Sequence, residues 1–284
     1  MPRDLTRIAS PDKPETERNW WVHVILLAVC VIAMLPVVWM VMTAFMPRDV
    51  AKAVPPQWLF PPTLDAFRML IFEQGMLGFL KNSLIVSVSS TLLSVTIGMF
   101  CAYALARFEF AGKEDVSFWI LTNRMMPAVA VILPMFLIFK TLNLLDTYVG
   151  LILLYTAMQL PFVVWMLKGY FEDIPRQLEE IALVDGDTWF GAFRRVVLPL
   201  MTPAITATAI FVLILSWNEY AFALFLSGSA TKTLPPAVVI FAVNAEVSWD
   251  VLGAACLIIT APIMIFVIAV QKQFIRGLSM GMVR

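Results

Sequence analysis

The chain has 284 residues, of which 61% are hydrophobic and 14% charged, and its formal net charge is zero. Soluble domains are nearer half apolar and a quarter charged, so this composition indicates a membrane protein. The apolar stretches are much longer than the roughly ten residues of a barrel strand, which favours helical spans. The sequence has no basic run of the kind that nucleic-acid-binding proteins use, so we expect no nucleic-acid partner.

Residue types that build metal sites and catalytic triads are scarce. Cys30, Cys101 and Cys256 fall far apart inside apolar stretches, which is typical of reduced cysteines that pack as small hydrophobes. His23 is the only histidine, which leaves almost nothing for a histidine-based metal site or a catalytic triad. We therefore expect no metal site and no cofactor bound by this chain.

Hydropathy predicts an all-α, polytopic membrane protein with six transmembrane helices. Residues 1–19 are polar and predict a cytoplasmic tail, and residues 20–284 predict one transmembrane domain. The first span, residues 20–45, is too long for a signal-peptide core and lacks a small-residue cleavage site, so we expect it to remain. The other spans are expected at about residues 82–106, 116–139, 149–171, 204–226 and 251–270.

The segments between the spans are expected to be mostly irregular. A proline-rich external loop at residues 46–81 should contain a short amphipathic helix near residues 64–72. The segment with Pro235 and Pro236 is expected to be a loop, and residues 271–284 a polar tail.

The distribution of basic residues predicts the orientation of the chain. Six spans place both termini on one side of the membrane. Thirteen of the twenty Lys and Arg residues lie in the two tails and in segments 107–115 and 168–200, six lie in the opposite loops, and Arg124 falls inside the third span. The positive-inside rule therefore predicts cytoplasmic termini and a cytoplasmic 168–200 segment.

Residues 175–200 interrupt the apolar spans with a polar segment that predicts a helical hairpin. Pro175 suits the start of a new helix, and residues 176–184 are good helix formers with apolar residues at helical spacing. The Asp185-Gly186 pair is a turn signal, because glycine adopts the positive φ that ends a helix.

The second half of the hairpin predicts a helix from Asp187 or Thr188 to Val197. It should display aromatic residues on adjoining faces and end at the Leu198-Pro199 pair and Pro203; the aromatics are Trp189, Phe190 and Phe193. Two interpretations remain open from the residues alone. The hairpin could lie on the bilayer surface as an amphipathic element, or it could be held by a partner outside the membrane.

The sequence from Glu180 to Gly186, Glu-Ile-Ala-Leu-Val-Asp-Gly, resembles the EAA signature when read with the downstream Phe193, Pro199 and Pro203. This signature marks the permease subunits of binding-protein-dependent ABC importers. Glu180, Ala182, Asp185 and Gly186 match it by position, whereas Ile181 and Asp187 stand where alanine is common. The resemblance implies that the hairpin forms coupling helices, which dock in a groove of a cytoplasmic ATPase subunit. We therefore name residues 175–200 the coupling hairpin. Asp187 would alter the charge offered to that partner.

Further motifs resemble the carbohydrate-uptake, maltose-transporter branch of this family. They are Lys81-Asn82-Ser83-Leu84, residues 102–108, Met126-Pro127, Leu160-Pro161-Phe162 with Trp165, Trp217-Asn218-Glu219-Tyr220, and Arg276-Gly277. The resemblance implies the type I importer permease fold in a bacterial inner membrane. It also implies a second permease subunit as a heterodimeric partner, two ATP-binding subunits that carry ATP and Mg²⁺, and an extracytoplasmic solute-binding protein. The C-terminal sequence at residues 281–284 departs slightly from that of relatives.

Polar residues inside the spans are candidates for a translocation pathway. In a continuous third span Arg124 would lie roughly 12 Å deep, where an arginine costs at least about 3 kcal/mol unless it faces protein or water. Asn218 and Glu219 in the fifth span are further candidates, and Asn123 and Gln159, the latter in the fourth span, are weaker ones. Each of them could either line the pathway or hold helices together. Glu219 is the acid to consider as a partner of Arg124.

Three classes of function remain to be compared. No Gly-x-x-x-x-Gly-Lys-Ser/Thr phosphate loop is present in the sequence, so a transport subunit would need an ATPase on another polypeptide. An intramembrane enzyme would need a nucleophile and a base at membrane depth, for which the sequence offers no constellation. A scaffold or receptor would not need polar residues inside its spans. The solute, whether a sugar, another polyol or a non-sugar molecule, is left open.

Overall fold

The computed structural model describes residues 20–243 and 249–280, and within these residues every regular element is a helix. The elements are α1 (Trp20–Ala44), α2 (Arg48–Ala51), α3 (Asp65–Arg68), the π-helical turn η1 (Met69–Glu73), α4 (Met76–Arg107), α5 (Lys113–Asn123), α6 (Ala128–Thr141), α7 (Tyr148–Asp173), α8 (Gln177–Val184), α9 (Trp189–Ala192), the π-helical turn η2 (Phe193–Val197), α10 (Leu198–Trp217), α11 (Ala221–Leu226), α12 (Leu234–Val243) and α13 (Trp249–Met280). The predicted tail at residues 1–19 and the chain end at 281–284 lie outside the described residues.

Within these residues, five helices are long and apolar enough to cross a membrane, and a bent pair of helices supplies a sixth span if counted as one. The all-α class is thus confirmed. The predicted positions of four spans agree closely with the helices α1, α4, α7 and α13, and the short helix expected near residues 64–72 is present as α3 with η1. α4 begins at Met76, one to two turns before the predicted start, and α13 continues through the predicted polar tail to Met280.

The predicted third span is not one continuous helix. α5 and α6 meet at an angle of 97°, and with 11 and 14 residues neither is long enough to cross about 30 Å of hydrocarbon alone. The break falls at Pro127, which lacks an N–H and disfavours helical geometry in the residue before it. Arg124 therefore stands at the end of α5, beside the break, and not in the middle of a straight span.

The predicted fifth span also differs from the structure. α9, η2 and α10 form one uninterrupted helix, Trp189–Trp217, so the prediction that Pro199 and Pro203 end the hairpin was wrong. The N–H of Leu198 donates to Phe193 O, five residues back. Pro199 thus follows a π-type turn, which explains how the helix continues through it. Beyond Trp217 the chain breaks at residues 218–220 and restarts as the short α11.

The segment with Pro235 and Pro236 was expected to be a loop, yet it forms the start of α12. Both prolines occupy the first turn, where a backbone N–H has no partner within the helix and a fixed φ is already suitable. The proline pair therefore lies at the start of a helix, and the prediction of a loop was wrong.

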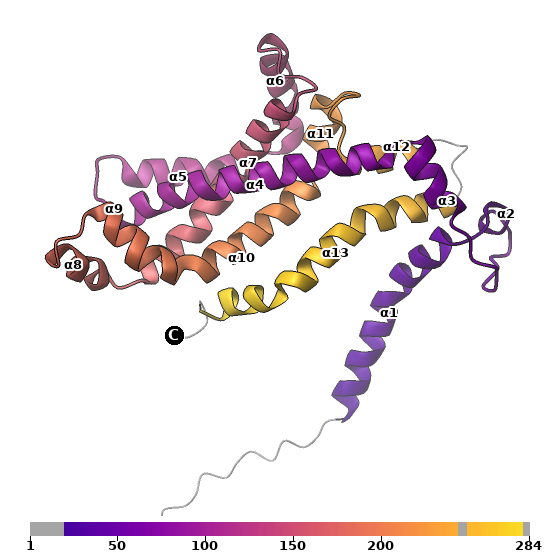
Figure 1. Cartoon of the computed structure of the whole chain (residues 1–284), viewed down its shortest axis with the longest axis horizontal. Coiled ribbons are helices and arrows are strands. Elements are labelled where there is room, and N and C mark those ends of the chain that lie inside the picture. Colours follow the sequence, from indigo (N-terminus) through magenta and orange to yellow (C-terminus); the bar gives the residue numbers. More distant parts are fainter. Residues whose placement is uncertain (1–19, 244–248, 281–284) are drawn as a thin grey trace, which may run out of the picture.

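α4 forms the centre of the fold (Figure 1). It packs along α7, and α10 packs against both of these helices and against α13. The hairpin helices α8 and α9 lie at one end of the long axis, and α2, α3 and α12 lie toward the other. One buried cluster, near the hairpin, joins α4, α7, η2 and α10. Another joins α3, η1 and α12 with the ends of α1, α4 and α13 that lie far from the hairpin.

α1 stands apart from this bundle and packs against α13 (Figure 1). Its apolar side chains are exposed along most of the helix, and only Thr43 and Ala44 at its end are buried. Exposed apolar surface of this extent is expected where lipid or another membrane helix covers it.

Candidate coupling hairpin and membrane cavity

The turn of the coupling hairpin has the geometry that its sequence predicts. Gly186 has a φ of 91°, in the left-handed region. Its N–H donates to Leu183 O, and the N–H of Asp187 donates to Ala182 O at 3.0 Å. This is the Schellman pattern, in which a glycine closes a helix and satisfies its last carbonyl groups. The predicted end of the first hairpin helix is therefore confirmed.

Asp187 and Thr188 together stabilise the start of the second hairpin helix. Its carboxylate accepts a hydrogen bond from Thr188 N at 2.9 Å and forms an ion pair with Arg195 at 3.2 Å. The Thr188 hydroxyl in turn accepts from Gly191 N at 3.1 Å, as an N-cap residue does. The charge of Asp187, unusual for the EAA signature, is thus compensated within the hairpin itself.

The three hairpin aromatics occupy different environments. Phe193 is buried at 3% exposure, and its ring lies 4.6 Å from that of Tyr103 and 5.7 Å from that of Phe100. Trp189 and Phe190 are exposed by 51% and 64%. Phe193 therefore belongs to the core that anchors the hairpin, which leaves Trp189 and Phe190 as the aromatics that a partner could contact.

The remaining candidate residues lie mainly on the outer surface of the hairpin. Glu180, Asp185, Gly186 and Pro199 are exposed, and Ala182 is half-buried. Ile181 and Val184 of the first hairpin helix are exposed as well, so the exposed side chains of the hairpin include both apolar and acidic groups.

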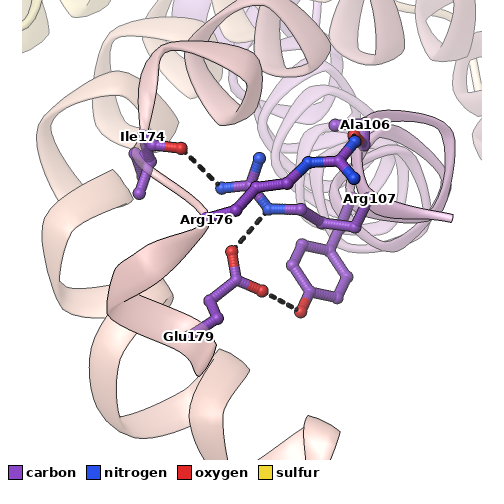
Figure 2. Close-up of polar contacts among 6 residues, drawn as sticks. Ala106, Arg107, Ile174, Arg176 and Glu179 are labelled. Atoms are coloured by element: carbon purple, nitrogen blue, oxygen red, sulfur yellow. Dashed lines mark hydrogen bonds and ion pairs between the residues drawn. The ribbon is translucent and has the colours of Figure 1, made fainter. Parts of the chain in front are cut away.

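Glu179, adjacent to the signature residue Glu180, is buried and was not singled out by the sequence. Its Oε1 accepts a hydrogen bond from Arg107 Nε in an ion pair, and its Oε2 accepts from the Tyr103 hydroxyl at 2.6 Å. The side chains of Arg107 and Glu179 are only 4% and 2% exposed. Figure 2 shows Glu179 rising from α8 to meet Arg107 at the end of α4.

Two arginines extend this cluster to the backbone (Figure 2). Arg107 Nη2 donates to Ile174 O, directly after α7, at 3.0 Å, and Arg176 Nη2 donates to Ala106 O in the last turn of α4 at 3.1 Å. Cations at the C-terminal end of a helix satisfy carbonyl groups and oppose the helix dipole. The carbonyls at the ends of α4 and α7 are therefore bound by arginines next to the hairpin.

A cavity of about 700 Å³ lies beside the break between α5 and α6. It brings together three of the four predicted pathway residues, Arg124, Gln159 and Glu219, with Asn123. The Arg124 guanidinium carbon lies 4.9 Å from the centre of the Phe162 ring, a cation–π distance. Gln159 is buried at 7% exposure, and no hydrogen bond of its side chain is seen among the described residues.

Glu219, although it lines the cavity, and Asn218, which does not, both form hydrogen bonds with the backbone. The carboxylate of Glu219 accepts a hydrogen bond from Phe222 N at 3.0 Å and so caps α11. Among the side chains that the structure describes, no ion pair joins Glu219 to Arg124. Asn218 is exposed, does not line the cavity, and donates to Ile214 O at 2.8 Å.

A second polar cluster, which was not predicted although Asn82 and Ser83 belong to a motif named above, lies at the opposite end of α4 from the hairpin. Asn82 Nδ2 donates to Ala230 O and Lys232 O, and its Oδ1 accepts from the Tyr148 hydroxyl at 2.6 Å. The Ser83 hydroxyl accepts from Leu234 N at 2.7 Å. Asp146, at a φ of 53°, completes the cluster, which we name the outer clamp.

The carboxylate of Asp146 accepts hydrogen bonds from three backbone N–H groups, of Gly228, Ala230 and Thr231, and from the Thr231 hydroxyl. Burial acts to raise the pKa of Asp146, but these hydrogen bonds outweigh it and hold the pKa below its usual value. The loop after α11 is thereby fastened to the loop before α7.

Side chains that could hold a metal ion are not gathered anywhere in the described part of the chain, since no three His, Cys, Asp or Glu residues meet there. Cys30, Cys101 and Cys256 are free thiols.

The fold and these sites define a polytopic membrane subunit with a helical hairpin exposed at one end. Residues 94–280 match the family model described as "Binding-protein-dependent transport system inner membrane component". The chain therefore belongs to this family of ABC transporter permeases, which are transport components and not enzymes.

Individual relatives extend the match over most of the chain. The sulfoquinovosyl glycerol transport system permease protein of Agrobacterium fabrum is 34% identical over 249 residues, with 87% of each chain covered. The trehalose transport system permease protein of Mycobacterium tuberculosis is 33% identical over 258 residues, covering 89% of this chain and 93% of that protein. A chain from the crystal structure of a bacterial ABC transporter for alginate import superposes with a TM-score of 0.78 at 22% identity, covering 93% of this chain and all of that chain.

Proposed function

We propose that this chain forms one half of the membrane pathway of an ABC importer for a carbohydrate or a similar polyhydroxylated solute. The observation that carries the proposal is the exposed hairpin at one end of a bundle that also holds a cavity lined by a few polar side chains. The trehalose permease, similar over nearly its whole length, supports a sugar as the solute class. A non-carbohydrate solute is the alternative.

The hairpin is the proposed contact with a cytoplasmic ATPase subunit. Trp189 and Phe190 offer exposed aromatic surface, and the acidic Glu180 and Asp185 of the same hairpin are also exposed. Because Phe193 fixes the base of the hairpin in the core, a displacement of the exposed tip would be passed on to α10 and α4. Hydrolysis on the ATPase subunits, which would hold ATP and Mg²⁺, would thus drive a rigid-body movement of the permease.

The cavity is the proposed section of the pathway in this chain. Arg124, Asn123 and Gln159 offer hydrogen-bond donors, and Trp119 and Phe222 provide aromatic surface in the same lining. Small-molecule sites typically combine a mostly apolar lining with a few polar groups, and these polar groups could bind solute hydroxyls. Asn218 lies outside this lining, and its proposed role is to stabilise the C-terminal end of α10 through its hydrogen bond to Ile214 O.

The complete transporter is proposed to contain this chain, a second permease subunit as a heterodimeric partner, two ATP-binding subunits and an extracytoplasmic solute-binding protein. The exposed apolar face of α1 suits a second membrane subunit or lipid. The excess of basic residues near the hairpin and tails supports cytoplasmic termini.

Reconstitution of the complex tests this function. ATPase activity that co-purifies with the chain should rise when the solute-binding protein is loaded with its sugar, and a titration of sugars against that binding protein should identify the solute. Phe190→Ala should leave the folded permease intact but reduce the amount of ATPase subunit that co-purifies with it. An ATPase activity that does not change when any sugar-loaded binding protein is added would contradict the proposal.

A further inference from the structure

The buried contact between Arg107 and Glu179 joins three elements at a single point. Glu179 belongs to the first hairpin helix, Arg107 is the last residue of α4, and Ile174, which Arg107 also binds, directly follows α7. We infer that this ion pair is a rigid joint through which the coupling hairpin moves α4 and α7 together. Arg107 and Glu179 would then be positioning residues for transport. The inference rests on the proposed coupling function.

The geometry of the joint leaves little freedom between the hairpin and α4. Both oxygens of Glu179 are engaged, one by Arg107 and the other by Tyr103, which lies one helical turn before Arg107 on the same helix. Arg176 adds a return contact from the hairpin to Ala106 O. With side chains 4% and 2% exposed, the pair is shielded from water and ions that would weaken an exposed pair.

The helices held by this joint also wall the membrane cavity. Ile97 and Cys101 of α4 line it, and Cys101 lies about 9 Å along the helix from Arg107 at about 1.5 Å per residue. α7 contributes Gln159, Pro161 and Val164 to the same lining. A displacement of α8 that is transmitted without loss would therefore shift two walls of the cavity at once.

Stability alone is a weak explanation for this arrangement. A buried ion pair is often no more stabilising than apolar side chains of similar volume, because both charges must leave water. If the pair only stabilises the fold, a well-packed apolar pair should restore both folding and transport. If it positions the hairpin through directional hydrogen bonds, an apolar pair should restore folding but not transmission.

Variants of the complete transporter separate these two roles. The informative ones are Glu179→Gln, which keeps the shape but removes the charge, and the double variant Arg107→Met with Glu179→Leu, which replaces the pair by apolar groups. Glu172→Gln is the matched control, because it removes the exposed Lys168–Glu172 pair at the end of α7. The measurement is solute taken up per ATP hydrolysed in proteoliposomes, normalised to assembled complex.

We expect Glu179→Gln and the double variant to lower uptake per ATP by about fivefold or more, the lower range of coupling factors between sites, while Glu172→Gln stays at the wild-type ratio. If both joint variants fail to assemble, Tyr103→Phe, which removes one hydrogen bond to the same carboxylate, should still lower the ratio to a smaller extent. Wild-type uptake per ATP in the assembled double variant, or in Tyr103→Phe when the others do not assemble, would overturn the inference.

A distance measurement distinguishes failure of the joint from failure of the proposed function. Spin labels at the exposed Val184 and Glu109 report on the hairpin and on the segment after α4, in a background without the three native cysteines. In the wild-type complex their distance distribution should be the same with and without nucleotide, and it should broaden in Glu179→Gln. A wild-type distance that changes with nucleotide would contradict the joint even if transport is normal. An absence of ATP-driven uptake by the wild-type complex would instead contradict the proposed function.

Discussion

The two ends of α4 are fastened to the rest of the chain by different chemistry. At the hairpin end, Arg107 and Glu179 meet side chain to side chain, and both are buried. At the opposite end, Asn82, Ser83 and Asp146 of the outer clamp bind mainly backbone groups of residues 228–234. A side-chain pair requires both partners, whereas a side chain that binds backbone holds the path of a loop whatever side chains that loop carries. The hairpin contact therefore depends on the identity of both side chains, whereas the outer clamp tolerates substitutions in the loop that it binds.

The comparison predicts the largest loss of stability at the hairpin end. Glu179→Ala leaves Arg107 buried without its counter-charge, which should lower the free energy of unfolding by about 3–5 kcal/mol. The thermal unfolding midpoint of the detergent-solubilised protein measures this loss. Glu172→Ala, which breaks an exposed pair at the end of α7, should change the free energy of unfolding by less than about 0.5 kcal/mol. Equal effects of the two variants would show that burial of the Arg107–Glu179 pair does not increase its contribution to stability.

A smaller loss is expected at the outer clamp. Asp146→Ala removes the acceptor for three N–H groups and the Thr231 hydroxyl, but the site is partly exposed and water can replace some of these bonds. We expect a loss of about 1–3 kcal/mol, with increased hydrogen exchange at residues 228–231. Substitution of Lys232, whose backbone carbonyl is the part bound by Asn82, should have almost no effect on this exchange. A large effect of Lys232→Ala would show that the clamp depends on the loop side chains after all.

Most helix positions and the hairpin turn could be predicted from the sequence, but the buried ion pair and the break in the third span could not. Hydropathy located α1, α4, α7 and α13, and glycine chemistry located the turn at Gly186, because both are local properties. The Arg107–Glu179 pair joins residues 72 positions apart, so no local signal separates the buried Glu179 from its exposed neighbour Glu180. The break at Pro127 was missed because a proline inside an apolar stretch can kink a span or end it, and tertiary contacts decide which. The pathway candidates Arg124, Gln159 and Glu219 nevertheless all line the cavity. Polar side chains inside apolar spans are costly to expose to lipid, so they face protein or a cavity.

A third test addresses the turn that connects the two halves of the hairpin. Gly186→Val places a β-branched side chain at a φ of 91°, which should destabilise the hairpin by about 1–2 kcal/mol, although a Cβ there would meet no neighbouring atom. Uptake should fall while the membrane helices remain inserted, and Gly186→Asn, which tolerates a positive φ better, should be milder. Normal uptake by Gly186→Val would argue against coupling through this hairpin.

The smallest effect is expected from acidification at the outer clamp. The pKa of Asp146 lies below its usual value in the folded protein, so its contribution is fully present above an unfolded-state pKa of about 3.9. That contribution is lost as the pH falls through the lower, folded-state pKa. The difference in unfolding midpoint between wild type and Asp146→Asn should therefore be constant near neutral pH and shrink on strong acidification. A difference that grows as the pH falls would have the wrong sign for this assignment.

The separation of α1 from the bundle has a consequence for biosynthesis. α1 packs against α13, and about 200 residues lie between the two helices in the sequence. At roughly 5–20 residues per second, the ribosome needs on the order of 10–40 s to make that stretch. During this interval α1 must remain inserted in the membrane without the helix that later accompanies it. Its apolar, almost fully exposed surface allows this, because a helix that is apolar on all sides is stable in lipid by itself.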